Sequence, residues 1–111
     1  MTAKEFVSNF KKEKDYSLML YTSDKEATAV SEIIKKMNLT KKQEILMYDV
    51  IEGILNNTFY SILLGLDGST SIGDVQHTYK IYDEYGNLIS DCGELEAEAW
   101  EPFNEKWEKV A

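Results

Sequence analysis

Three capping boxes lie within the first 43 residues and indicate where helices begin. In a capping box, a Ser or Thr side chain and a Glu or Gln side chain three residues later each accept the other's free backbone N–H at a helix start. The chain has this spacing at residues 2–5, 23–26 and 40–43. Apolar residues follow each box at intervals of three and four, so the sequence predicts three consecutive helices.

The predicted helices differ in how clearly the pattern defines their extent. After the first helix, the apolar run at 16–22 is compatible with a bridging loop or a brief strand. The second helix is predicted from about residue 24 to 37, with Asn38 as its stop. The third is apolar over a wide arc, which predicts the most buried helix. Its second half, residues 58–66, fits either a helix or a strand.

A β-hairpin is predicted from residue 75 to residue 90. Apolar and polar residues alternate over 75–82, which is typical of a strand with one buried face, and His77 falls on that face. Residues 83–86, DEYG, have the composition of a type I turn that ends in a left-handed Gly86. Residues 87–90 form the predicted return strand.

Helical spacing resumes near Cys92 and continues to the C-terminus. At 100° per residue, one arc of this helix is apolar and the opposite arc is acidic. The apolar arc holds Leu95, Ala99, Trp100, Phe103, Trp107 and Val110. The acidic arc holds Glu94, Glu98, Glu101, Glu105 and Glu108. Pro102 has no backbone N–H, so it is expected to kink or split the helix.

The order of these elements predicts an α+β fold in a single domain, residues 1–111. It consists of three N-terminal helices, a β-hairpin and a C-terminal amphipathic helix kinked at Pro102. A lone hairpin is not stable by itself, so one of its faces must pack on the helices.

Acidic residues are concentrated in the last third of the chain. Residues 1–66 carry nine acids and nine bases, whereas residues 67–111 carry eleven acids and three bases, which accounts for the whole net charge of −8. Such a field repels phosphates, so DNA and RNA are not expected as ligands. It would instead steer a basic protein partner toward this end of the chain. Solubility alone is an alternative reason for an acidic surface.

Composition also bears on compartment. No apolar run reaches about 18 residues, so no membrane span is expected. The N-terminus lacks the apolar segment of a signal peptide, and a single cysteine, Cys92, fits a reducing environment. We therefore expect a cytoplasmic protein.

The sequence shows no pattern that specifies catalysis or a cofactor. A zinc site needs four ligands, and His77 and Cys92 are the only residues of their types. The loop DGSTSIGD at 67–74 has Ile72 where a calcium loop requires glycine. No phosphate-binding glycine motif is present. We expect no cofactor, no metal and no enzymatic activity, and keep a small hydrolase with a carboxylate pair as the third of three hypotheses.

The first hypothesis is a protein-binding module whose contacts lie on the hairpin turn and the acidic helix. Acidic side chains would meet lysines or arginines, and aromatic rings would anchor the partner. The candidate residues are Tyr82, Asp83, Glu84, Tyr85, Glu94, Glu98, Trp100 and Glu101. The second hypothesis is a regulatory or structural module, including a homodimer, whose acidic face is only solvated. Glu96 points into the apolar arc, so we expect it to have a hydrogen-bond donor such as a tyrosine hydroxyl or a lysine, to form a local ion pair, or to lie at the rim.

Three segments resemble small bacterial proteins. They are LDG at 66–68, YKIYDEYGNLIS at 79–90 and GELEAEAWEPF at 93–103. The size, acidity and α+β order are also similar to the immunity proteins of toxin systems, including contact-dependent growth inhibition. The resemblance covers about the last 50 residues. It implies that the chain binds and neutralises a cognate basic toxin, for example a nuclease.

Overall fold

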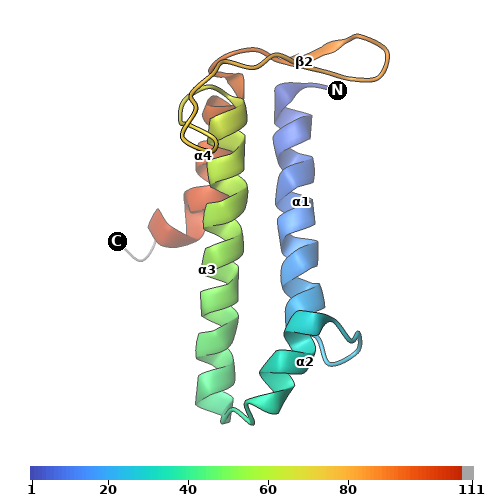
Figure 1. Cartoon of the computed structure of the whole chain (residues 1–111), viewed down its shortest axis with the longest axis vertical. Helices are drawn as coiled ribbons and strands as arrows, with labels where there is room; N and C mark the ends of the chain where they lie inside the picture. Colours follow the sequence, from blue (N-terminus) through green and yellow to red (C-terminus); the bar gives the residue numbers. More distant parts are fainter. Residues whose placement is uncertain (109–111) are drawn as a thin grey trace.

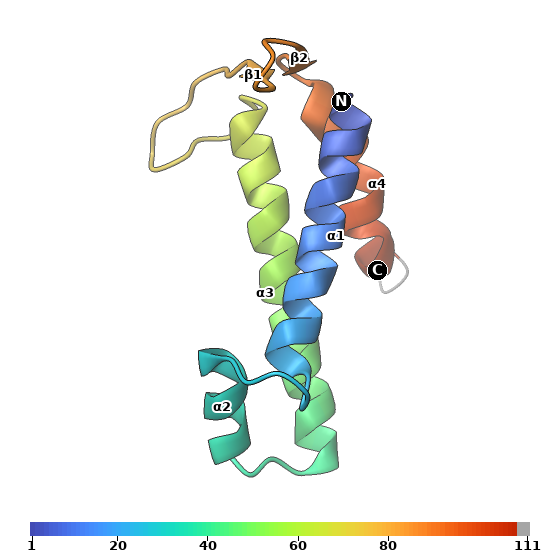
Figure 2. The same cartoon turned by 90° about the vertical axis from the view of Figure 1, so that its right-hand side faces the viewer.

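Four helices and one short hairpin make up the fold. The computed structural model of the protein describes residues 1–108, and the side chains of residues 1–104. In chain order the elements are α1 (Ala3–Thr22), α2 (Ala29–Lys36), α3 (Lys41–Leu66), β1 (Ile81–Tyr82), β2 (Leu88–Ser90) and α4 (Glu94–Glu108). Helices α1 and α3 lie side by side, with α4 and the hairpin at one end and α2 at the other (Figures 1 and 2). The predicted α+β fold is confirmed.

Two of the three predicted capping boxes form. Thr2 and Thr40 are the N-cap residues of α1 and α3, and their side chains accept the backbone N–H groups of Glu5 and Gln43. The capping box predicted at residues 23–26 is wrong, and α2 begins later than expected. Its cap is a reciprocal pair at Thr28 and Ser31, with N–H···O distances of 2.8 and 3.0 Å.

Both segments of undecided type are helical. The apolar run at 16–22 continues α1, where Leu18 is buried on the same side as Val7. Residues 58–66 continue α3, and Leu63 there is fully buried. These residues have no neighbouring strand to pair with, whereas a helix satisfies its own backbone hydrogen bonds.

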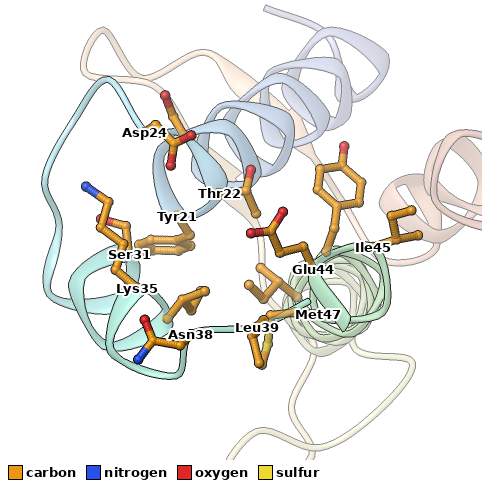
Figure 3. Close-up of a pocket in the computed structure, with 14 residues that line it drawn as sticks. Tyr21, Thr22, Asp24, Ser31, Lys35, Asn38, Leu39, Glu44, Ile45 and Met47 are labelled. Atoms are coloured by element: carbon orange, nitrogen blue, oxygen red, sulfur yellow. The ribbon is translucent and has the colours of Figure 1, made fainter. Parts of the chain in front are cut away.

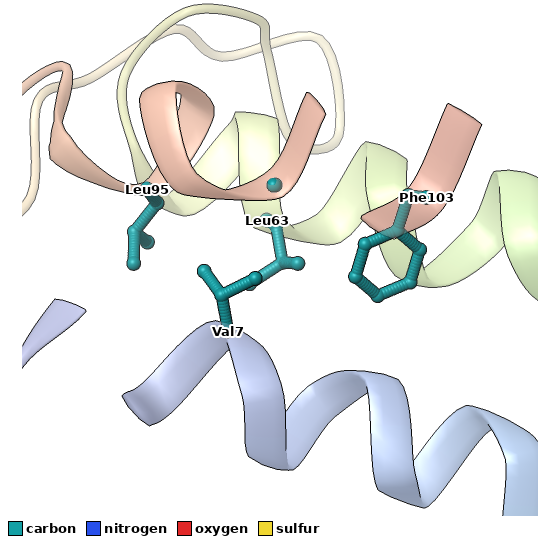
Figure 4. Packing of buried hydrophobic residues seen from close by; sticks show 5 residues of the cluster. Val7, Leu63, Leu95 and Phe103 are labelled. Atoms are coloured by element: carbon teal, nitrogen blue, oxygen red, sulfur yellow. The ribbon is translucent and has the colours of Figure 1, made fainter. Parts of the chain in front are cut away.

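The hydrophobic core lies between α1, α3 and α4. Its buried members are Val7, Leu63, Leu95, Ala99 and Phe103 (Figure 4). The last three lie on the predicted apolar arc of α4 and confirm it, while Trp100, placed on the same arc, is 55% exposed. The predictions for Glu105, Trp107, Glu108 and Val110 concern side chains outside the described part of the chain.

Helix α4 is not split at Pro102 but continues as one helix to Glu108. Its end turns away from α3 in Figure 1. The side chain of Asn56 on α3 donates a hydrogen bond to the carbonyl of Phe103 at 2.6 Å. This bond ties the last described turns of α4 to the middle of α3.

A lysine is buried between α1 and α3. The side chain of Lys14 is 2% exposed, and its Nζ lies 3.4 Å from Glu52 Oε1 and 3.6 Å from Asp15 Oδ1. A buried ammonium group is costly unless paired, so these two carboxylates make its position tolerable.

The hairpin is shorter than predicted. Strand β1 contains only Ile81 and Tyr82, and the alternating residues before it are not paired as a strand. The placement of His77 on a buried face was wrong, because His77 is exposed. The reason is that the return strand β2 ends at Ser90, after which the chain enters α4, so residues 75–80 have no partner strand. The turn forms as predicted, with Gly86 at a φ of +83°.

Candidate protein-binding surface

The start of α4 is held by a carboxylate from a distant part of the chain. Asp67, at the end of α3, is fully buried, and its Oδ1 accepts the backbone N–H of Leu95 at 2.9 Å. The first N–H groups of a helix have no partner within the helix, so Asp67 caps α4 from outside. Gly93, at a φ of +88°, provides the left-handed backbone that leads into the helix. The sequence analysis missed this role of Asp67, because the two residues are 28 positions apart.

Three of the predicted glutamates form one exposed row on α4. Glu94, Glu98 and Glu101 follow each other at intervals of four and three, which places them on one side of the helix. Glu94 also accepts the Asp91 N–H at 2.8 Å, a local bond at the helix start. Within residues 1–104, none of the three is in an ion pair. We call Glu94, Glu98 and Glu101 the acidic row.

The ion pairs of residues 1–104 lie elsewhere. They are formed within and between α1, α2 and α3: Lys11–Asp15, Lys14–Asp15, Lys14–Glu52 and Lys35–Glu32. Lysines of these helices therefore do not neutralise the acidic row, and its negative potential faces solvent.

The four candidate residues of the hairpin turn are exposed to different degrees. Tyr85 is 82% exposed, Tyr82 and Glu84 are also exposed, and Asp83 is half-buried. Asp83 is used within the turn, where its Oδ1 accepts the N–H groups of Tyr85 and Asn87, both at 2.9 Å. The backbone hydrogen bond from Asn87 is the main reason that the pKa of Asp83 lies below its ordinary value.

The structure separates the eight candidate residues into two surfaces. The hairpin tip extends beyond the N-terminal end of α1, whereas α4 descends beside α3 (Figure 1). Tyr82, Asp83, Glu84 and Tyr85 therefore lie on one projection, and Glu94, Glu98, Trp100 and Glu101 on another. Of the second group, Trp100 also contacts a core helix, through Tyr60 on α3.

Trp100 lies on α4 next to an aromatic pair that connects it to the core. Its ring centroid is 6.3 Å from that of Tyr60, and Tyr60 stacks on the buried Phe103 at 6.1 Å. Burial raises the pKa of Tyr60, a hydrogen bond with the Asn104 side chain opposes the rise, and the charge of Glu96 adds to it. Trp100 is therefore in contact, through Tyr60, with the buried core residue Phe103.

Glu96 finds its hydrogen-bond donor in a loop. Ser69 Oγ lies 2.8 Å from Glu96 Oε2 and 3.1 Å from Asp67 Oδ2, so its single proton can be donated to either carboxylate. The donor is neither a tyrosine nor a lysine, because the loop after α3 folds back over the start of α4. Ser69 thus helps to hold the loop against the helix that carries the acidic row.

A pocket of about 580 Å³ lies at the opposite end of the molecule, between the end of α1, α2 and the start of α3 (Figure 3). Half of its 14 lining residues are apolar or aromatic, among them Tyr21, Ile34, Leu39 and Met47. Asp24 and Glu44 also line it, which is the kind of feature that the hydrolase hypothesis requires. No hydrogen bond or ion pair joins either carboxylate to another side chain in the described chain. The pocket therefore shows no assembled acid–base pair.

The described residues contain no group of three or more His, Cys, Asp or Glu side chains arranged to hold a metal ion. Among the described helices, none combines the length and apolarity needed to cross a membrane. No protein-family model, no curated protein and no solved structure matches the chain.

Proposed function

We propose that the chain is a protein-binding module that recognises a basic partner through α4. The acidic row carries this proposal. Glu94, Glu98 and Glu101 are neighbours on one helix face, and each like-charge pair at such a spacing costs a few tenths of a kcal/mol. A helix face that served only solvation would be more stable with mixed charges. The row has no ion pair within residues 1–104, which is better explained by a cationic surface that it meets in a complex.

Trp100 supplies the apolar part of the proposed contact. Tryptophan is enriched among the residues that dominate binding energy at interfaces, where it fills a pocket of the partner. Here its half-exposed ring is adjacent to Glu101 in the sequence and is supported by Tyr60. A rigid aromatic side chain beside carboxylates suits a partner surface that contains lysine or arginine around an apolar depression.

The partner that we propose is a basic toxin domain, which the chain binds and neutralises. The resemblance to immunity proteins in size, acidity and α+β order supports this class of partner. The segments 79–90 and 93–103, which resemble small bacterial proteins, include the turn, the start of α4 and the acidic row. The hairpin tip would form a second contact only with a partner large enough to span both surfaces.

The test uses affinity capture from the source organism with paired charge variants. The bait Glu98→Lys/Glu101→Lys is compared with Asp24→Lys/Glu26→Lys, which changes the net charge equally at exposed positions in the loop before α2, at the opposite end of the molecule. We expect the unmodified chain and the control to retain the same partner, and the α4 variant to bind at least about tenfold more weakly. Equal retention by both variants would remove α4 as the binding surface.

A second measurement tests neutralisation. If mass spectrometry identifies a basic protein, that protein is expressed alone and together with each variant, and cell growth is followed. The proposal predicts that growth is restored by the unmodified chain and by the control but not by the α4 variant. A captured partner that is acidic, or that has no effect on growth, would contradict the proposed toxin.

A further inference from the structure

The chain is more extended than its length requires. Its radius of gyration is 16.4 Å, whereas about 13 Å is expected for 111 residues. It exposes 7755 Å² of surface, against about 6,300 Å² for a compact monomer of this length. The difference of about 1,500 Å² is larger than the roughly 800 Å² that each partner buries in a standard interface.

Much of the exposed apolar surface lies on the first half of α3. Leu46, Val50 and Ile54 are 63%, 55% and 59% exposed, and their spacing of four places them on one side of the helix. Helix α4 packs only along the other half of α3, so it does not reach them (Figures 1 and 2). We call Leu46, Val50 and Ile54 the α3 stripe.

The α3 stripe is suited to pairing with itself. If two copies of α3 cross antiparallel at Val50, Leu46 of each copy meets Ile54 of the other. A two-fold interface requires this reciprocity, because the same surface serves both partners. Apolar side chains of similar size then face each other along the whole contact.

The charges favour the same arrangement. Residues 23–50, which include α2 and the start of α3, carry five acids and five bases, so the end of the molecule that they form has no net charge. The opposite end carries the glutamates of α4 and the acids of the hairpin turn. Antiparallel pairing places the acidic end of each copy beside the end of the other copy that has no net charge, whereas parallel pairing would place the two acidic ends together.

We propose that a second copy of this chain covers the α3 stripe, forming an antiparallel two-fold dimer centred on Val50. This inference does not depend on the proposed function, because the acidic row is not part of the stripe. The dimer buries apolar surface that the monomer leaves in water and keeps the two acidic ends apart.

Sedimentation equilibrium of the full chain tests the dimer. The variant Ile54→Glu is compared with Ile33→Glu, since Ile33 on α2 is 56% exposed and lies outside the stripe. We expect the unmodified chain and Ile33→Glu to be dimers, and Ile54→Glu to weaken association about a hundredfold or more, because a carboxylate would be buried without a partner. Circular dichroism checks that each variant keeps its helix content. A monomeric unmodified chain, or an Ile54→Glu chain that still dimerises, would overturn the proposal.

Disulfide trapping then tests the orientation. All samples carry Cys92→Ser, because Cys92 is exposed and would react. Under oxidation, Val50→Cys alone should link, and a mixture of Leu46→Cys with Ile54→Cys chains should link to each other. Leu46→Cys alone should stay unlinked. Efficient linking of Leu46→Cys to itself would instead show a parallel pair and overturn the antiparallel arrangement.

Discussion

Replacing Asp67 with alanine is expected to loosen the start of α4. The substitution removes the acceptor of the Leu95 N–H, at 2.9 Å, and of the Ser69 hydroxyl, at 3.1 Å. Both Asp67 and Leu95 are fully buried, so water cannot easily replace the lost partner. A hydrogen bond to a charged group contributes about 1.5–3 kcal/mol, and an unsatisfied buried donor carries its own penalty. We therefore expect a loss of about 3 kcal/mol in the free energy of unfolding.

Such a loss is large for a domain of this size. Total stabilities are typically about 5–15 kcal/mol, so up to half of the stability is at risk. The melting temperature should fall by about 15 °C, since 1 kcal/mol corresponds to roughly 5 °C in a domain of about 100 residues. Urea denaturation followed by circular dichroism measures the free energy, and hydrogen exchange measures the protection of the α4 amides.

Two variants separate the capping role from a general effect of mutation. Asp67→Asn keeps a carbonyl oxygen that can accept the Leu95 N–H, so it should lose only about 1 kcal/mol. Ser69→Ala removes an exposed hydroxyl and should lose less than Asp67→Ala. The capping argument is refuted if Asp67→Ala stays within about 0.5 kcal/mol of the unmodified chain, or if Asp67→Asn is as unstable as Asp67→Ala.

Two further predictions concern other charged groups. Glu52→Ala should lower the free energy of unfolding by about 2 kcal/mol, because it removes a partner of the buried Lys14. Lys14→Met should lower it less, since an apolar side chain of similar length fills the site. Urea denaturation that gives the opposite order of stabilities would contradict this argument. Asp83 should titrate below its ordinary pKa of 3.8, because backbone N–H groups stabilise its carboxylate. A lowered pKa in the folded state means that the stabilisation is present above about pH 4 and is lost as the pH falls through the folded pKa. Carbon NMR of the side-chain carboxyl measures this directly, and a midpoint at or above 3.8 would show that the turn does not favour the charged form.

Local patterns in the sequence predicted the elements of this fold well. The capping boxes at Thr2 and Thr40, the left-handed Gly86 and the apolar face of α4 all depend on residues within about four positions of each other. Interactions over such short spacings depend less on the rest of the fold than contacts between distant segments do. The error at α2 has the same origin, because two local caps competed and the pair at residues 28 and 31 formed instead of the one at 23–26.

The candidate surface was only partly predictable. The exposed acidic row on α4 follows from helical periodicity, and the structure places Glu94, Glu98 and Glu101 as expected. The hairpin tip was expected to share a surface with it, because the two segments are close in the sequence. The direction in which a hairpin leaves the core depends on what it packs against, and that information is absent from a local pattern.

The sequence by itself determined where the long helices start, which face of α4 is apolar and how the turn closes. Tertiary structure alone decided that Asp67 caps α4, that Lys14 is buried beside Glu52, and that the turn and the acidic row point in different directions. The physical reason is the separation of the interacting residues along the sequence, because helix periodicity and turn geometry are properties of a few consecutive residues. A cap that joins residues 28 positions apart, or an ion pair that joins residues 38 positions apart, exists only after the helices have packed.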